Sequence, residues 1–367
     1  MRSLVIGGTG PTGHLVVRGL VARGHRVTIL HTGRHENPEL PAEVEHLHTD
    51  PYDPAATDRA LEGRRFDLCV AMYGRLRALA ELTRGRVGRF LSVGGVPAYR
   101  GFMNPELHRP AGLPVPTAED APLVRDPSED EKGYRIVRTE EAVLAQHPGA
   151  THFRYPYVYG PYQLVPREWC IVRRILDGRD RIVLPEGGLT LHHYGYAENL
   201  AHGLLLAVDQ PEAAAGEIFH CADLEVLSLR QVVEIVAAAL DASLKIVSMP
   251  WELALPARPL VAQPLPTHRV LDLTKIRTRL GYRDRVPARE ALAHTARWLC
   301  AHRPEPGGME ETVLQDPFDY AAEDRLIEAW EGALAGLPRI SFAREPGYTL
   351  AYSGPGGRAR SKPEFEG

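Results

Sequence analysis

Residues 3–13 read Ser-Leu-Val-Ile-Gly-Gly-Thr-Gly-Pro-Thr-Gly, a short and mostly apolar run that passes directly into spaced glycines. Gly7 permits a tight turn, Gly10 lets the backbone approach a ligand, and Gly13 lets a following helix pack closely on the strand. The start of that helix presents free N–H groups and a partial positive charge, which favour a diphosphate. Pro11 suits this first helical turn because its missing N–H breaks no helical bond. The segment predicts the diphosphate loop of a dinucleotide-binding βαβ unit. The residues expected to contact the dinucleotide are Gly7, Thr9, Gly10, Pro11, Thr12 and Gly13.

Short apolar runs alternate with helix-like stretches through the first 160 residues. Such alternation predicts βαβ units and a parallel sheet with helices on both faces. We therefore expect an α/β fold with a Rossmann-type, doubly wound parallel sheet. The strands predicted for it are Ser3–Ile6, Arg26–Leu30, Val44–His48, Phe66–Ala71, Arg89–Val93 and Thr151–Tyr155, with helices at His14–Arg23 and Arg75–Thr83.

Three further regions complete the expected organisation around a dinucleotide domain over residues 1–160. Residues 100–132 are rich in proline and acid without a clear period, which predicts a long loop over the carboxyl ends of the strands. A smaller, mixed substrate lobe is expected over residues 161–300, with segments that return to the main domain. Residues 301–367 predict a C-terminal extension with one helix, Ala321–Leu334, and an irregular tail. The elements predicted for the lobe are helices at Arg173–Leu176, Asn199–Val208 and Leu229–Leu240, the last with Ser228 as N-cap, and a strand at Glu217–Cys221.

Charge and composition limit the classes of partner. Forty-three basic and 47 acidic residues give a net charge of −4, which offers no broad attraction to nucleic acid or anionic membranes. The longest aliphatic run, Leu204–Val208, is far too short to span a bilayer. The four cysteines are widely separated, with no paired spacing for zinc or a redox dithiol. We expect a cytoplasmic protein that acts on a small molecule and binds neither nucleic acid nor membrane.

The end of the second predicted strand bears on which dinucleotide binds. NAD-binding proteins usually place an acid there for the ribose 2′-hydroxyl, whereas NADP-binding proteins place a cation for the 2′-phosphate. Here residues 30–35 read Leu-His-Thr-Gly-Arg-His, with no acid before Glu36. Arg34, helped by His31 or His35, is placed to meet a 2′-phosphate, although loop arginines are commonly just solvated. We expect NADP, with NAD as the alternative.

Further segments match the pattern of a known family. Residues 154–161 read RYPYVYGP, residues 196–201 read YAENLA, and residues 272–282 read DLTKIRTRLGY. With the glycine loop, these segments resemble the extended short-chain dehydrogenase/reductase family, the NAD-dependent epimerase/dehydratase group, over roughly residues 1–300. The resemblance implies a nicotinamide cofactor and a homodimer. It also implies that the cofactor is contacted by Asp50, Ser92, Tyr155 and Pro156.

The family's catalytic pair is altered in this chain. Family enzymes place tyrosine and lysine four residues apart on one helix face, where the tyrosine moves a proton and the lysine lowers its pKa. In one register of residues 132–144, KGYRIVRTEEAVL, Tyr134 is the acid and Arg138 replaces the lysine, cationic but unable to relay a proton. In the other register, supported by the EEAVL ending, Lys132 takes the tyrosine position and Ile136 the lysine position. The relay is then lost and Tyr134 is an ordinary helix residue.

A serine or threonine that would polarise the substrate is also missing at the family position, which falls on Gly94 or Gly95. Ser92 lies earlier, inside the predicted strand. The leading hypothesis is an NADP(H)-dependent oxidoreductase or epimerase-type enzyme that acts by hydride transfer on a hydroxyl or carbonyl of a small molecule. Its proton is moved by Tyr134 or by Lys132. Two alternatives remain: a non-redox isomerase, cyclase or lyase on the same scaffold, and a non-catalytic dinucleotide-binding protein.

Histidines provide two further candidates. His46 and His48 alternate on a predicted strand and so share a face, but no acid or cysteine stands at ligand spacing in the sequence, which argues against a metal site. His192 and His193 follow a glycine-rich bend and are expected to be hydrogen-bonded structural residues. The loop around His31–Arg34 resembles the branch of the family that contains chloroplast stem-loop-binding proteins and many bacterial oxidoreductases.

Overall fold

The computed structural model describes residues 1–72, 75–344 and 346. The chain divides into two compact units, Met1–Phe318 and Asp319–Gly367. The second unit contains helix α13 (Tyr320–Ala335), close to the predicted bounds, and most of the irregular tail predicted after it lies outside the described residues. The domain boundaries expected near residues 160 and 300 fall inside the first unit and stay predictions. In the described part of the chain, no helix has both the length and the apolar surface that crossing a membrane needs.

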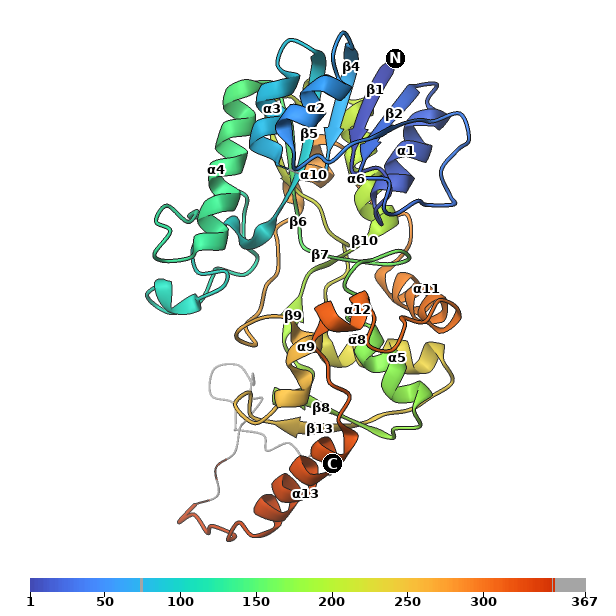
Figure 1. Cartoon of the computed structure of the whole chain (residues 1–367). Coiled ribbons are helices and arrows are strands. Elements are labelled where there is room, and N and C mark those ends of the chain that lie inside the picture. Colours follow the sequence, from blue (N-terminus) through green and yellow to red (C-terminus); the bar gives the residue numbers. More distant parts are fainter. Residues whose placement is uncertain (73–74, 345, 347–367) are drawn as a thin grey trace. The chain divides into compact units, whose positions relative to one another are not determined.

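Seven strands of the described residues form one parallel sheet in the order β11-β6-β5-β4-β1-β2-β3 (Figure 1). The strand order reverses direction between β1 and β4, as in a doubly wound sheet, and ligands bind such sheets at this switch point. The α/β, Rossmann-type fold predicted from the sequence is confirmed. The strands are β1 (Arg2–Ile6), β2 (Arg26–His31), β3 (Glu45–His48), β4 (Phe66–Ala71), β5 (Val87–Gly95), β6 (Thr151–Tyr155) and β11 (Ile218–His220).

Two apolar cores, one on each face, hold the helices to this sheet. Alternation along β1 sends Val5 into one core and Leu4 and Ile6 into the other, so the strand is buried on both faces. The Val5 core includes residues of α1 (Gly13–Ala22), α6 (Ala197–Asp209) and α10 (Thr274–Arg279). The opposite core includes residues of α3 (Leu76–Thr83) and α4 (Glu131–Gln146), and α2 (Pro54–Ala60) packs beside α3.

Apart from one short helix, the remaining elements of the first unit form small sheets and helices beyond the carboxyl ends of the main strands. Helix α8 begins at the predicted N-cap Ser228, whose hydroxyl accepts from Gln231 N while the Gln231 side chain accepts from Ser228 N. The paired strands are β7 (Tyr157–Tyr159) with β10 (Tyr194–Tyr196), β8 (Arg181–Pro185) with β13 (Lys245–Met249), and β9 (Leu191–His192) with β12 (Leu227–Ser228). The helices of this region are α5 (Trp169–Leu176), α8 (Leu229–Ala239), α9 (Arg258–Val261), α11 (Ala288–Ala301) and α12 (Met309–Leu314). The short helix α7 (Pro211–Ala214) lies instead at the amino end of β6, where Thr151 Oγ1 donates to Ala214 O (2.7 Å).

Two elements predicted for the lobe belong to the main domain instead. The helix predicted at Asn199–Val208 is part of α6, which packs beside α1 in the Val5 core. The strand predicted at Glu217–Cys221 was assigned to the lobe, but β11 joins the main sheet beside β6. The apolar pattern identifies a strand without identifying its neighbour, so the assignment was wrong although the strand exists.

The long loop predicted over residues 100–132 is irregular, with a short 3₁₀ turn at Pro105–Leu107. A second 3₁₀ turn, Val96–Ala98, precedes it. The middle of the loop is held to the chain ahead of α10, because Thr117 N donates to Val270 O (2.7 Å) and Asp272 N donates to Thr117 O (2.8 Å). The loop ends at Asp130, which caps α4.

Candidate cofactor and substrate site

The glycine loop after β1 has the geometry that a diphosphate loop requires. Gly7 adopts φ +90°, a conformation that side chains disfavour. A Cβ on Gly13 would lie 2.3 Å from Gly7 O, so the helix approaches the strand too closely for any other residue. A Cβ on Gly10 would meet nothing within 4 Å, which leaves the space above this residue open for a ligand.

Helix α1 presents unpaired amides at this loop. Its N-cap, Thr12, makes no side-chain capping bond. The first helical bonds run from His14 N to Gly10 O (3.3 Å) and from Val16 N to Thr12 O (3.0 Å). Backbone N–H groups ahead of such bonds lack a helical acceptor and stand at the positive end of the helix dipole. The loop can therefore bind an anion.

A single cavity of about 1100 Å³ extends from this loop to the small sheets of the lobe. This volume exceeds the roughly 300–1000 Å³ typical of a pocket for one small ligand. The cavity can therefore hold an extended ligand together with a second molecule. Its wall on the main-sheet side is formed by the glycine loop, His31, Thr32, His35 to Asn37, Val93 to Pro97, Lys132, Ile136 and Tyr155 to Val158.

Most of the residues predicted to contact the cofactor line the cavity, but Arg34, Asp50 and Ser92 do not. Arg34 is exposed outside the wall, and its amide donates to Thr32 Oγ1 (3.3 Å). Asp50 is also exposed and accepts from Tyr52 N (2.9 Å). Ser92 is fully buried inside β5, behind the wall. The predicted residues that line the cavity are Gly7, Thr9, Gly10, Pro11, Thr12, Gly13, Tyr155 and Pro156.

Helix α4 places one of the two catalytic registers at the cavity. Lys132 and Ile136, one helical turn apart, both line it, whereas Tyr134 and Arg138 lie outside its wall. The Arg138 side chain is 56% exposed and pairs with Glu141 (2.7 Å). The geometry therefore brings together the two residues of the second register and neither residue of the first.

A buried polar network that the sequence did not reveal stands behind Gly94. The Ser92 hydroxyl and His152 Nδ1 are hydrogen-bonded at 2.8 Å, and His152 Nε2 lies 3.4 Å from Glu140 Oε1. Arg154 donates to both Glu140 oxygens (2.8 and 2.6 Å). Burial by itself would raise the pKa of Glu140, but the hydrogen bonds and charge of Arg154, with His152 nearby, lower it to about 2. This network ties α4 to β5 and β6, and its only signal in the sequence was Arg154 in the RYPYVYGP segment.

The lobe end of the cavity is lined by two buried arginines, Arg167 and Arg269. The Arg167 guanidinium lies 3.3 Å from the ring centre of Tyr157 and 4.4 Å from that of Tyr194. Arg269 Nε donates to Phe102 O (3.1 Å). Among the described residues, Arg167 Nε and Arg269 Nη2 have no hydrogen-bond partner. Sequence reasoning missed both residues, because no motif marks an arginine that packs between distant aromatic rings.

His193 adds a third donor at this end of the cavity. His193 Nδ1 accepts from Leu271 N (2.8 Å), so the proton of the neutral ring is on Nε2, which is buried without a partner in the described part of the chain. Burial lowers the pKa of His193 to about 4. Its neighbour His192 is also buried and bonds to Thr267 O (2.9 Å). The two guanidinium groups make this end of the cavity positively charged, which favours an anionic group of a ligand.

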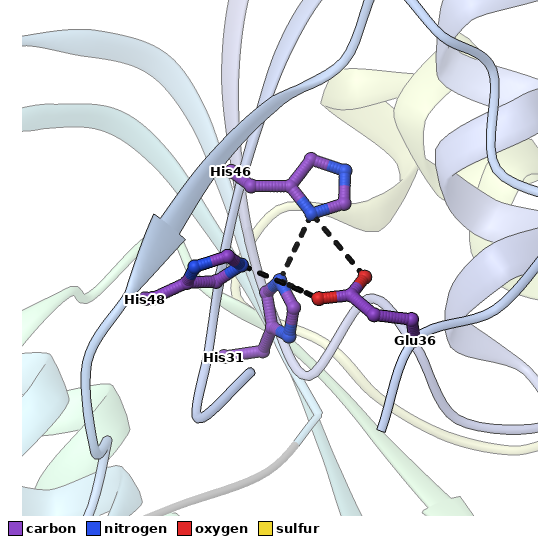
Figure 2. A group of neighbouring side chains, drawn as sticks. All are labelled: His31, Glu36, His46 and His48. Atoms are coloured by element: carbon purple, nitrogen blue, oxygen red, sulfur yellow. Dashed lines mark hydrogen bonds and ion pairs between the residues drawn. The ribbon is translucent and has the colours of Figure 1, made fainter. Parts of the chain in front are cut away.

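The opposite end of the cavity lies near the carboxyl ends of β2 and β3. The sequence argued against a metal site there because no acid stands at ligand spacing from His46 and His48, and this premise is wrong. Glu36 Oε2 lies 3.5 Å from His46 Nδ1, and Glu36 Oε1 lies 3.3 Å from His48 Nε2 (Figure 2). The chain between the two strands brings the carboxylate back over the histidines, which spacing along the sequence does not reveal.

No family model matches the chain. The 3-diazoavenalumate denitrifying reductase of a Streptomyces species is 27% identical over 226 residues, which cover 57% of this chain and 72% of that protein. The chloroplast stem-loop binding protein of 41 kDa b from Arabidopsis thaliana is 27% identical over 237 residues, 59% of this chain and 57% of that protein. The second relative represents the branch that the loop around His31–Arg34 resembles.

Solved structures extend the likeness to most of the chain. The dTDP-glucose 4,6-dehydratase DesIV from Streptomyces venezuelae, solved with NAD and TYD bound, superposes with a TM-score of 0.62 at 23% identity. The match covers 83% of this chain and 98% of that chain. The protein is thus a doubly wound α/β protein with a Rossmann-type sheet. More narrowly, it has the fold of the NAD-dependent epimerases and dehydratases, and the family resemblance predicted from the sequence is confirmed at the level of the fold.

Proposed function

We propose that the protein is an enzyme that binds a nicotinamide dinucleotide and interconverts a hydroxyl and a carbonyl on a small molecule by hydride transfer. The observation that carries the proposal is the shared cavity of about 1100 Å³, which joins the open glycine loop to the buried cations of the lobe. The bound nicotinamide would supply or accept the hydride. The reductase named among the relatives and the NAD in the DesIV structure support this choice.

The active site that we propose is atypical. Reduction of a carbonyl needs a proton for the developing alkoxide. Lys132 is the titratable side chain that α4 presents to the cavity, and we infer that it donates this proton. Ile136, one turn on, can neither hold a ribose hydroxyl nor stabilise a charge.

The donors of the lobe indicate the substrate class. Arg167, Arg269 and His193 line one cavity, and each has one buried nitrogen without a hydrogen-bond partner in the described residues. Leaving such donors unpaired costs about 1–3 kcal/mol each, more when they are charged. We infer a substrate with a carboxylate or phosphate group, whose oxygens accept from these donors.

The choice of dinucleotide rests on the end of β2. Arg34, with His31 and His35 nearby, supports the expected preference for NADP. Glu36 supports the alternative, NAD, because it lines the cavity where an acid would accept the ribose 2′-hydroxyl. We retain NADP as the proposal. We also retain the cytoplasmic location, which rests on cysteines without paired spacing.

A second candidate is a non-redox isomerase, cyclase or lyase that holds the dinucleotide tightly. The observation that favours it is the pair of cavity residues Gly94 and Ile136, which stand where hydride-transferring relatives keep a polar serine or threonine and a lysine.

The test is NADPH and NADH binding, followed by consumption of the reduced dinucleotide with paired carbonyl compounds. Each pair would consist of a carboxylate or phosphate and its neutral ester. We expect turnover with acidic members and little with their esters. Tight dinucleotide binding without consumption across the panel would contradict hydride transfer and favour the second candidate. Preference for the esters would contradict the assigned substrate class.

A further inference from the structure

Four side chains of the described residues converge beside the carboxyl ends of β2 and β3: His31, Glu36, His46 and His48 (Figure 2). One ligand atom from each lies within 4.8 Å of the corresponding atom of every other. His31 Nε2 is 3.1 Å from His46 Nδ1 and 3.9 Å from Glu36 Oε1. The remaining contacts of Glu36, to His46 and His48, are 3.5 and 3.3 Å.

The sheet itself sets three of these positions. His31 and His48 are direct partners in the parallel β2–β3 ladder, so their side chains stand on the same face. His46, two residues before His48, shares that face because side chains alternate along a strand. The rings meet edge to face, with centroids 4.8 Å apart for His31 and His48 and 5.1 Å for His31 and His46. Glu36 then approaches from the loop between the strands.

The spacing of the donor atoms fits a small divalent cation. Zinc binds imidazole nitrogen and carboxylate oxygen at about 2.0–2.2 Å, which places two ligands of a tetrahedral ion roughly 3.4 Å apart. The contacts named above, from 3.1 to 3.9 Å, bracket that value. The two remaining pairs, between His48 and each of the other histidines, lie within 4.8 Å, so the side chains must draw together for all four atoms to bind one ion.

The chemistry of the donors selects the kind of cation. Imidazole suits zinc, cobalt and nickel, whereas magnesium and calcium prefer sites made of oxygen. Three neutral imidazoles and one carboxylate would leave a bound divalent ion with one net positive charge. The site is also accessible, since Glu36 and His48 are 54% and 57% exposed while His31 is buried. An ion can therefore enter from solvent and bind against a fixed inner ligand.

We propose that His31, Glu36, His46 and His48 form a binding site for a divalent transition-metal ion of the zinc class. One change accompanies binding. Gly33 N faces His31 Nδ1 (3.3 Å), so in the metal-free cluster the proton of His31 is on Nε2 and is shared with His46. A metal ion on Nε2 requires this proton to move to Nδ1, so the imidazole stays neutral and the hydrogen bond from Gly33 N is lost. The metal site goes beyond the proposed function, but it shares His31 and Glu36 with the wall of the cavity proposed to bind the dinucleotide. Metal uptake is therefore measured without dinucleotide, so that its outcome is separate from the outcome of the dinucleotide titration.

The experiment uses the full chain, stripped with a chelator and kept free of dinucleotide. Cobalt(II) would be titrated while its visible absorption is followed, and zinc would be titrated by calorimetry. We expect one equivalent of either ion per chain. His46→Ala and Glu36→Gln are each expected to weaken binding by at least about tenfold.

The control variant is His294→Ala, which removes an exposed histidine that also faces a carboxylate, Glu290, at 3.7 Å. It is expected to bind cobalt as the wild type does. Thermal melting shows whether each variant is folded, and Glu36→Gln changes only an exposed side chain. No uptake by the wild type would overturn the proposal, as would unchanged affinity in a folded His46→Ala/His48→Ala double variant.

Discussion

His152 occupies the space that a side chain at Gly94 would need: a Cβ there would lie 2.6 Å from His152 Nε2. His152 is held in place from both sides, by Ser92 and by Glu140. In the family that the sequence resembles, this part of the chain carries a serine or threonine. In this protein the imidazole of His152 fills the space beside Gly94, so the chain has no room for a hydroxyl side chain there.

This arrangement predicts that Gly94→Ser destabilises the fold. The new side chain would displace a buried, hydrogen-bonded histidine, and such overpacking costs about 1–3 kcal/mol. Gly95→Ser is the matched control, because its Cβ would meet Pro97 Cδ at 3.2 Å and no other side chain within 4 Å. Urea denaturation would measure the unfolding free energy of both variants and of the wild type. If Gly94→Ser unfolds at the same urea concentration as the wild type, the steric account is wrong.

The orientation of α4 predicts which residue moves the proton. Lys132→Met removes the titratable group at the cavity and is expected to lower kcat by about 100-fold or more, as for a lost general acid. Tyr134→Phe is expected to leave kcat within about twofold, because Tyr134 lies outside the cavity wall. The steady-state rate of NADPH oxidation gives kcat for both variants. The reverse pattern would restore the register with Tyr134 as acid.

The choice of dinucleotide predicts opposite effects for two neighbours. Arg34→Ala is expected to weaken NADPH about tenfold, equivalent to about 1.4 kcal/mol, and NADH little, because only the 2′-phosphate pairs with the guanidinium. Glu36→Gln is expected to strengthen NADPH relative to NADH, since it removes a negative charge from the cavity wall. Fluorescence titration gives both affinities. An equal loss of NADPH and NADH on Arg34→Ala would contradict the assignment.

Buried His220 predicts a pH dependence of stability. His220 Nδ1 donates to Asp272 O (3.0 Å) and Nε2 accepts from the Tyr99 hydroxyl, so the neutral ring is fully paired. Burial lowers the pKa of His220 from 6.5 to about 4. The unfolded chain therefore takes up the proton first, and the stabilisation is complete above pH 6.5 and is lost as the pH falls toward 4.

The contribution of His220 is on the order of 3 kcal/mol, since each pKa unit corresponds to about 1.4 kcal/mol. His220→Gln is expected to flatten the dependence of the unfolding free energy on pH between 6.5 and 4. His294→Gln, at an exposed position, is expected to keep the slope of the wild type. Chemical denaturation at several pH values tests this, and an unchanged slope in His220→Gln would refute it.

Local pattern was sufficient for most of the fold. Phe66–Ala71 and Thr151–Tyr155 were predicted with the bounds that β4 and β6 have, because short apolar runs between turn residues form buried strands wherever they pair. Ser228 was identified as a helix N-cap for the same reason, since capping is decided within one helical turn. The sheet that β11 joins was not predictable, because pairing depends on residues far away in the chain.

The site was predicted only in part. The glycine loop and Tyr155–Pro156 line the cavity as predicted, because each is a short motif whose sequence determines its local geometry. The position of Glu36 beside His46 depends on the path of the loop between β2 and β3. The position of Arg167 beside Tyr194 depends on how the lobe folds. Neither arrangement leaves a periodic or spaced pattern in the sequence.

The most direct test of the central claim is calorimetric titration of the purified chain with NADPH and NADH. Gly10→Val is the decisive variant, because its Cβ would meet no protein atom within 4 Å and would stand where a diphosphate must approach. Gly149→Val is the control, equally open and outside the cavity. We predict that the wild type and Gly149→Val bind the dinucleotide, while a folded Gly10→Val binds at least about tenfold more weakly. No uptake of either dinucleotide by the wild type, or equal affinity in Gly10→Val, would contradict the account.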